Sequence, residues 1–220
     1  PPVQTRRRGF KTRPLIDGFM PEAESVRLSF EDGARAVELA RESVEAYVLH
    51  GQREQPGSMR DAFYARTGAL VRIRSTRGRG RLRGCAGAYR GSDQLGHAIV
   101  EAGIKAASDD SCGSEIEPAE LSNVTVSVCV VTGYTLTDDP VTDIELGTHG
   151  VAVDAGANHA WLYPTIPVEN DWSAGEYLAR ACRKAKQSPF AWRDDDGVVV
   201  TLFEGQVFRE RDDGSIEDLE

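Results

Sequence analysis

The chain has 220 residues, of which 40% are hydrophobic and 28% are charged. This composition is typical of one folded domain with short tails and excludes a wholly disordered chain. No run approaches the roughly 18 apolar residues that a membrane-spanning helix needs, so we expect no such helix. A formal net charge of −9 argues against nucleic-acid binding by the surface as a whole.

The basic residues are mostly arginine. Only four of the 26 Lys and Arg residues are lysines, namely Lys11, Lys105, Lys184 and Lys186. An acidic surface poor in lysine suits a halophilic cell, where high salt screens the repulsion between carboxylates. A GC-rich genome would also favour arginine, and the sequence leaves both explanations open.

Two features bear on the compartment and on metals. Arg6, Arg7 and Arg8 near the start are followed by no apolar segment, so we expect no secretory signal and a cytoplasmic protein. The cysteines are Cys85, Cys112, Cys129 and Cys182. None forms a C-x-x-C pair or has a histidine at zinc-finger spacing, so we expect free thiols and no metal site.

In chain order, the first 28 residues are basic and lack a periodic apolar pattern, which predicts an extended arm over residues 1–28. An N-cap signature followed by apolar residues on one helical face predicts a helix over residues 30–50. Alternating patterns predict strands over residues 70–74 and 79–83. Helical spacing then returns over residues 93–106.

The second half of the chain predicts more strands. Valines alternate with smaller residues over residues 124–130, which indicates a strand with one buried face. The other expected elements are strands at 150–154 and 160–164, a helix opened by the capping box of Ser173 and Glu176, a hairpin of 198–203 and 206–209, and a solvated acidic tail at 211–220. Helices packed on a mostly antiparallel sheet make an α+β fold, whose domain we place at residues 29–210.

The segment Arg83-Gly84-Cys85-Ala86-Gly87 carries the strongest chemical signal. Gly84 and Gly87 would allow unusual backbone angles and close approach by a ligand at a bare corner of the chain. Arg83 would favour the thiolate form of Cys85, which makes this cysteine a candidate nucleophile and Arg83 a candidate anion anchor. The alternative is a tight strand end holding a small buried cysteine.

A nucleophilic thiol needs a base, and His149 is the preferred candidate among the four histidines. It lies in the turn Gly147-Thr148-His149-Gly150, where glycines leave the side chain accessible. We therefore predict a catalytic pair of Cys85 and His149. The alternative for His149 is a histidine that only hydrogen-bonds a loop.

Arginines crowd the hairpin that precedes Cys85, and on a strand they would share one face. They are Arg72, Arg74, Arg77, Arg79, Arg81 and Arg83. Such a stripe suits a phosphate backbone, so RNA binding is an alternative function. No aromatic residues interleave for base stacking, and a charged edge strand that resists aggregation explains the same residues.

Several motifs together resemble the AMMECR domain family. Leu82-Arg83-Gly84-Cys85-Ala86-Gly87 is similar to its L-R-G-C-I-G signature. The other matching segments, in order, are Ala106-Ala107 with Asp109, Glu120-Leu121, Val126-Ser127-Val128, Gly147-Thr148-His149-Gly150, Pro164 to Glu169 with Trp172, and Cys182-Arg183-Lys184-Ala185 with Trp192. The chain departs from the family pattern at Ala86, at Thr165 and over residues 109–113.

The resemblance implies an α+β domain of two lobes, with the L-R-G-C-I-G segment near the cleft between them. The biochemical role of the family is not settled. Relatives fused to, or encoded beside, Memo-type and radical-SAM proteins imply a shared modification pathway and a cytoplasmic location. No cofactor is implied, and no partner beyond these classes.

We carry two hypotheses to the structure. In the first, the chain is an enzyme of cysteine-dependent group transfer or hydrolysis on an unknown small molecule or modified macromolecule, with Tyr163 and Glu169 as supporting groups in the cleft. In the second, it is a non-catalytic binding or adaptor module for RNA or a partner protein. The environment of the Cys85 sulfur separates the two.

Overall fold

The computed structural model describes residues 26–56, 60–78, 80–108 and 114–219. Most of the predicted N-terminal arm therefore lies outside the described residues, as do Arg79 and Cys112. No helix in these four ranges is long and apolar enough to cross a lipid bilayer.

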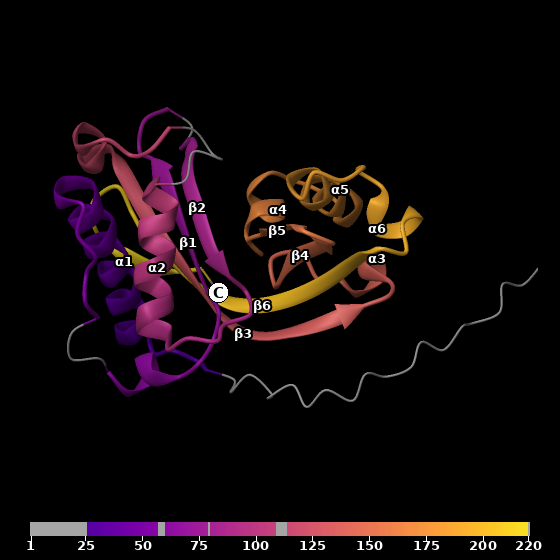
Figure 1. Cartoon of the computed structure of the whole chain (residues 1–220), viewed down its shortest axis with the longest axis horizontal. Coiled ribbons are helices and arrows are strands. Elements are labelled where there is room, and N and C mark those ends of the chain that lie inside the picture. Colours follow the sequence, from indigo (N-terminus) through magenta and orange to yellow (C-terminus); the bar gives the residue numbers. More distant parts are fainter. Residues whose placement is uncertain (1–25, 57–59, 79, 109–113, 220) are drawn as a thin grey trace, which may run out of the picture.

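The fold is α+β, as predicted, and is built on one curled antiparallel sheet (Figure 1). Over the described ranges the sheet has seven strands in the order β2-β1-β3-β6-β4-β5, with β7 paired to β6. The strands are β1 (Ala69–Ser75), β2 (Leu82–Ala88), β3 (Val124–Thr137), β4 (His149–Ala155), β5 (Asn158–Leu162), β6 (Val198–Glu210) and β7 (Ile216–Asp218). The helices are α1 (Phe30–His50), α2 (Leu95–Ser108), α3 (Pro140–Asp143), α4 (Ile166–Glu169), α5 (Ala174–Lys184) and α6 (Ala191–Asp194), with 3-10 turns at Asp61–Tyr64 and Pro118–Asn123.

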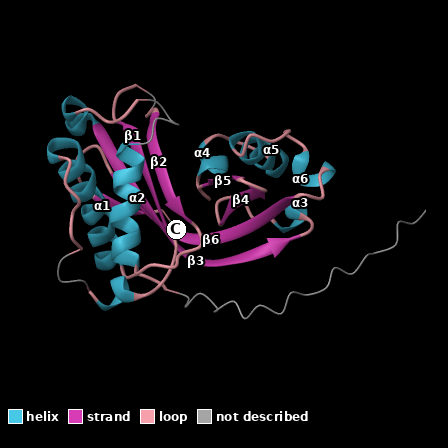
Figure 2. Ribbon diagram, viewed as in Figure 1, coloured by secondary structure: helices cyan, strands magenta, loops and turns pink. Residues whose placement is uncertain are grey.

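Two lobes share the long strands β3 and β6, which run through both of them (Figure 2). In the large lobe, α2 packs on β1 and β2 and α1 packs on β3 and β6, so the two helices cover one face of the sheet. In the small lobe, α4, α5 and α6 gather around β4 and β5. The predicted two-lobe arrangement is therefore present.

Local signals in the sequence explain where the main helices begin and end. Helix α1 spans the predicted residues, because the Ser29 hydroxyl caps its N-terminus by accepting the Asp32 N–H and Gly51 ends it with a φ of 61°. Helix α5 opens with the predicted capping box between Ser173 and Glu176. Glycine serves at position 51 because it adopts positive φ without a steric penalty.

One prediction about the C-terminal region is wrong and another is incomplete. Residues 198–210 form one continuous strand, β6, and not a hairpin that turns at Glu204-Gly205. A Cβ on Gly205 would lie 2.6 Å from the Cys129 sulfur, so the glycine allows β6 to pass close to β3 where the register of that pair shifts. The acidic tail is exposed over residues 211–215, as predicted, but residues 216–218 form β7, which pairs with β6.

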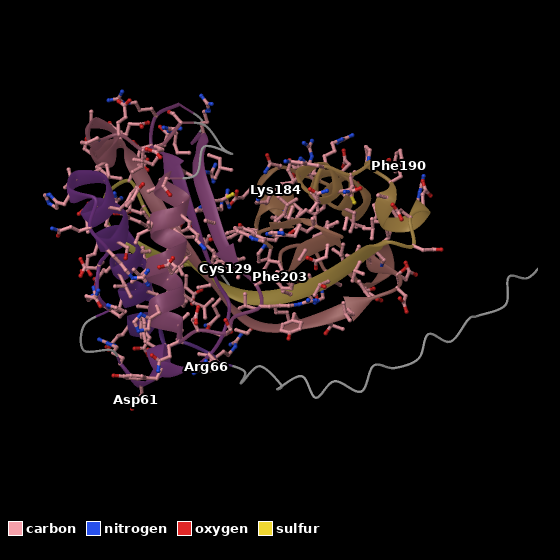
Figure 3. The ribbon with its side chains drawn as sticks, viewed as in Figure 1. Asp61, Arg66, Cys129, Lys184, Phe190 and Phe203 are labelled. Carbon is pink, nitrogen blue, oxygen red and sulfur yellow. The ribbon has the colours of Figure 1, made fainter. Side chains whose placement is uncertain are left out.

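Three apolar clusters fill the interior. The first lies between the sheet and the helices α1 and α2, and the second lies inside the small lobe around α5. The third joins the lobes and contains Cys85, Cys129, Trp161, Tyr163 and Phe203. Figure 3 labels Cys129 and Phe203 on the strands that both lobes share. The predicted reactive cysteine thus belongs to the cluster where the two lobes meet.

Candidate functional site

One row of residues crosses the sheet at the boundary between the lobes. Cys85 on β2 lies opposite Arg72 on β1, which lies opposite Ser127 on β3. Ser127 in turn lies opposite Arg209 on β6, and Arg209 opposite Glu217 on β7. Directly opposed residues in an antiparallel sheet point to the same face. The register therefore gathers a thiol, a hydroxyl and two guanidinium groups on the face away from α1 and α2.

Cys85 lies within β2 and not at a bare corner, and a bulge turns Arg83 away from it. Leu82 pairs with Arg74 and Gly84 with Ile73, which leaves Arg83 unpaired in the strand register. The Arg83 guanidinium donates to both carboxylate oxygens of Glu120, at 2.9 and 2.8 Å. These bonds raise the pKa of Arg83 and lower that of Glu120. Arg83, the predicted partner of the Cys85 thiolate, is therefore paired with the Glu120 carboxylate instead.

The cation at the Cys85 sulfur is Lys184, the last residue of α5. Its Nζ donates to Sγ at 3.3 Å and to the Trp161 carbonyl oxygen at 2.9 Å, and it lies 4.5 Å from the centre of the Trp161 ring. Cys85 is 8% exposed, whereas Lys184 is exposed. An ammonium group at this distance favours the thiolate. Figure 3 labels Lys184 on the side of the small lobe that faces β2.

Sequence reasoning did not assign a role to Lys184. The available signal was its rarity, because it is one of four lysines in the chain and lies in a segment that matched the family pattern. Its distance from Cys85 in sequence, 99 residues, hides the pairing. The contact between the last turn of α5 and the middle of β2 depends on how the two lobes pack against each other, which no local pattern shows.

His149 makes its described contacts at the start of β4. Its Nδ1 accepts a hydrogen bond from the Glu145 N–H at 3.0 Å, and its Nε2 lies 3.7 Å from the Glu204 carboxylate. This geometry matches the alternative of a histidine that binds a loop. The predicted pairing of His149 with Cys85 gains no support from these contacts.

Backbone atoms lie against both glycines of the motif. A Cβ on Gly84 would overlap the carbonyl oxygen of Ala106 in α2, and one on Gly87 would overlap that of Ala69 in β1. Gly87 also has a φ of 127°. Its carbonyl oxygen accepts a hydrogen bond from the Trp161 indole at 3.3 Å. These two glycines allow close packing around Cys85, and the space that we expected a ligand to use is occupied by the chain.

Tyr163 is fully buried at the seam, which is the boundary where the two lobes meet around Cys85 and Trp161. Its hydroxyl donates to the Leu70 carbonyl oxygen at 2.6 Å and lies 3.4 Å from that of Ser127. Burial raises its pKa well above the ordinary value, so the phenol stays protonated. The Arg72 guanidinium lies 5.1 Å from the centre of its ring. Tyr163 therefore joins the small lobe to β1 through Leu70 and Arg72.

Glu169, at the end of α4, faces three arginines of the large lobe. Its carboxylate lies 3.4 Å from Arg72, 3.3 Å from Arg74 and 3.8 Å from Arg209. Burial by itself would raise the pKa of this carboxyl, but the charges of Arg72 and Arg74 outweigh it and hold the pKa below its ordinary value. Glu169 is thus ionised and links the lobes beside Cys85.

The arginines of the first hairpin do not form one exposed stripe in the residues that the structure describes. Arg72 is buried and Arg74 half-buried, and both face Glu169. Arg77 is exposed and donates to the Asn123 side chain at 3.2 Å, and Arg81 is exposed. The bulge and the inward arginines leave few of these charges available to a phosphate backbone.

Among the described residues, the other cysteines and the acidic groups offer no competing site. Cys85, Cys129 and Cys182 take part in no disulfide. Burial raises the pKa of Cys129 to about 12, which makes it a packing residue. Within the described ranges, no three His, Cys, Asp or Glu side chains are grouped to hold a metal ion.

Comparisons with known proteins agree with this fold. The AMMECR1 family model matches residues 37–208. A protein of Halobacterium salinarum is 66% identical over 209 residues, which cover 91% of this chain and 99% of that protein. A protein of Methanopyrus kandleri is 34% identical, covering 84% of this chain and 92% of its own length. The crystal structure of an uncharacterized protein from Pyrococcus horikoshii superposes with a TM-score of 0.80 at 28% identity, covering 87% of this chain and 98% of that one. The chain belongs to the AMMECR1 family.

Proposed function

We propose that this protein is a cysteine-dependent enzyme of group transfer or hydrolysis, with Cys85 as nucleophile and Lys184 as its partner. The observation that supports the proposal is the 3.3 Å contact between the Lys184 ammonium and the Cys85 sulfur across the two lobes. Lys184 is exposed, so the pair lies at the edge of the seam where a substrate can approach. Because Cys85 is only 8% exposed, we expect the transferred group to be small or narrow.

The chemistry follows from the two groups. The Cys85 thiolate attacks the carbonyl carbon of a transferable acyl group, and the bond to the leaving group breaks as Lys184 gives that group a proton. The product is a thioester on Cys85 and a neutral Lys184 amine. Water or an acceptor alcohol or amine then attacks the thioester, releases the acyl product, and restores the thiolate and ammonium with its own proton.

The neighbouring groups position this pair. The Trp161 carbonyl oxygen and ring both hold the Lys184 ammonium, and the Trp161 indole is tied to Gly87 beside Cys85. Tyr163 and Glu169 act as supporting groups, as the sequence suggested. His149 and Arg83 are not assigned to the reactive centre, because their described contacts are with other residues.

Alkylation of the native protein with iodoacetamide, followed by mass mapping of each cysteine, tests the proposal. At pH 7 we expect Cys85 to react at least tenfold faster than Cys129 and Cys182, whose pKa values burial raises. Lys184→Met is expected to slow Cys85 about tenfold, whereas the matched control Lys186→Met leaves the rate unchanged.

An unchanged rate in Lys184→Met would reject Lys184 as the partner of Cys85, and equal and slow labelling of the three cysteines would reject the thiol chemistry. The non-catalytic binding or adaptor role would then be favoured. On the family resemblance alone, we further propose that the protein works in the cytoplasm, in a modification pathway shared with Memo-type or radical-SAM proteins.

A further inference from the structure

We infer that Arg72, Arg74 and Arg209 form an anion-binding site beside Cys85, which Glu169 occupies in this structure and which takes a carboxylate or phosphate group of the substrate. As a statement about the substrate, this inference rests on the function proposed above. The binding itself does not require any reaction at Cys85. The experiment below therefore separates the two.

The first argument is charge. Arg72 and Arg74 have Glu169 as their only carboxylate partner at ion-pair distance among the described residues. Arg209 is shared between Glu169 and Glu217, whose oxygen lies 2.8 Å from its Nε. Burial and the neighbouring charges of Arg72 and Arg209 lower the pKa of Arg74. One carboxylate thus faces more positive charge than it neutralises, in a chain whose net charge is −9.

The second argument is an unsatisfied donor. Arg72 is 8% exposed, and its Nε is buried with no hydrogen-bond partner. Buried donors are almost always paired in folded proteins, and a buried guanidinium N–H without an acceptor is costly. A ligand oxygen next to the guanidinium would supply the missing acceptor. Arginine suits this role because its planar fork can give two parallel hydrogen bonds to a carboxylate or phosphate.

The third argument is position. Arg72 is the direct register partner of Cys85, on the same face of the sheet, so their Cα atoms are about 5 Å apart. An anionic group held at Arg72 would place the adjoining part of the substrate near the sulfur. This arrangement lets the enzyme bind a substrate by its charged end and present a neighbouring carbonyl to the thiolate.

The occupant of the site is replaceable. Glu169 ends the four-residue helix α4, whose exit includes Asp171 at a φ of 54°. Besides the arginines, the Glu169 carboxylate contacts the Thr165 hydroxyl at 3.2 Å, within the same short segment. An incoming anion therefore has to displace a single side chain on a short surface segment.

Space for a ligand lies next to the cluster. A cavity of about 550 Å³ is lined by Arg74 and Arg209. It is also lined by acidic residues, of which Glu210 and Glu217 are paired with arginines and Asp212 and Asp213 are exposed. We therefore expect the anion at the arginines that face Glu169 and not throughout the cavity.

Calorimetric titration of the full-length Cys85→Ser protein tests the site without thiol chemistry. The probes are inorganic phosphate in one arm and succinate in the other, at constant ionic strength set with chloride. We expect saturable binding of one anion in at least one arm, and the stronger arm identifies the oxyanion. Glu169→Gln, which keeps the shape of the side chain and removes the competing charge, is expected to raise the affinity at least tenfold.

Arg72→Gln is expected to lower the affinity at least tenfold, and the matched control Arg81→Gln, on the same hairpin but exposed, leaves it unchanged. Because Glu169→Gln should strengthen binding, a folding defect cannot imitate the expected result. Absence of saturable binding in both arms with and without Glu169→Gln would overturn the inference. So would binding that neither Glu169→Gln nor Arg72→Gln alters. Failure of the alkylation test alone would leave the anion site standing.

Discussion

The two faces of the sheet in the large lobe are built from the same strands but have different tasks. The face toward α1 and α2 is mainly apolar, with Val71, Ile73, Val126, Val128 and Phe208 packed against the helices. The opposite face carries the row that runs from Cys85 to Glu217. Because side chains alternate along a strand, each strand packs against the helices on one face, and on the other it contributes to the polar row and to the third apolar cluster. Substitutions on the two faces therefore test different kinds of interaction.

The largest expected effect comes from the packed face. Gly84→Ala places a Cβ against the carbonyl oxygen of Ala106, and backbone on both sides leaves no flexible group to move. We expect a loss of about 3 kcal/mol in the free energy of unfolding, measured by urea denaturation. The control is Gly175→Ala in α5, where a Cβ meets nothing within 4 Å and alanine is the better helix former.

A Gly84→Ala protein as stable as the wild type would show that α2 can move away from β2. The close packing of this face would then not be what requires glycine in the motif. The prediction that Gly84 allows a ligand to approach closely would then be favoured again.

A smaller effect is expected on the opposite face from Tyr163→Phe. The change leaves the ring in place but removes the hydroxyl that donates to the buried Leu70 carbonyl oxygen at 2.6 Å. We expect a loss of about 1–2 kcal/mol in the free energy of unfolding, because a buried acceptor loses a donor. Tyr64→Phe, at a residue that is 51% exposed, is the control and should change stability by less than about 0.5 kcal/mol. Equal effects of the two substitutions would contradict the assigned role of Tyr163.

Much of the fold could be predicted because its signals are local. The caps and apolar stripe of α1 and the capping box of α5 lie within a few residues of the elements they define. The continuous strand β6 was missed because Glu204-Gly205 is typical of a turn. What decides between turn and strand at Gly205 is the passage of β3 beside it, which depends on residues about 75 positions away.

The site could be predicted only in part, for the same reason. Cys85, Tyr163 and Glu169, which belong to the proposed site, were all named from the sequence, Cys85 on the strength of a local motif. The bulge that turns Arg83 toward Glu120, and the closure that brings Lys184 to Cys85, are tertiary features without a local pattern. The rarity of lysine in the chain and the family motif could have singled out Lys184, but neither indicates that it contacts Cys85. A row across five strands becomes visible only once the register is known.

The smallest expected effect concerns the Glu169 carboxylate, whose ion pairs with arginines join the lobes on the polar face. Because the pKa of Glu169 is lower in the folded protein than in the unfolded chain, its ionised form stabilises the fold. That contribution is complete above the unfolded value of about 4.3 and is lost as the pH falls through the lower folded value. We compare the wild type with Glu169→Gln, which cannot titrate at this position.

Urea denaturation of both proteins from pH 7 to pH 3 measures the effect. The difference between their free energies of unfolding should be constant above about pH 5 and should shift toward Glu169→Gln by about 1 kcal/mol or less as the pH falls to 3. Other carboxyl groups titrate in both proteins and cancel in the difference. A difference that does not vary with pH would mean that the arginines do not stabilise the ionised Glu169 carboxylate. The polar face would then be held by packing alone, as the apolar face is.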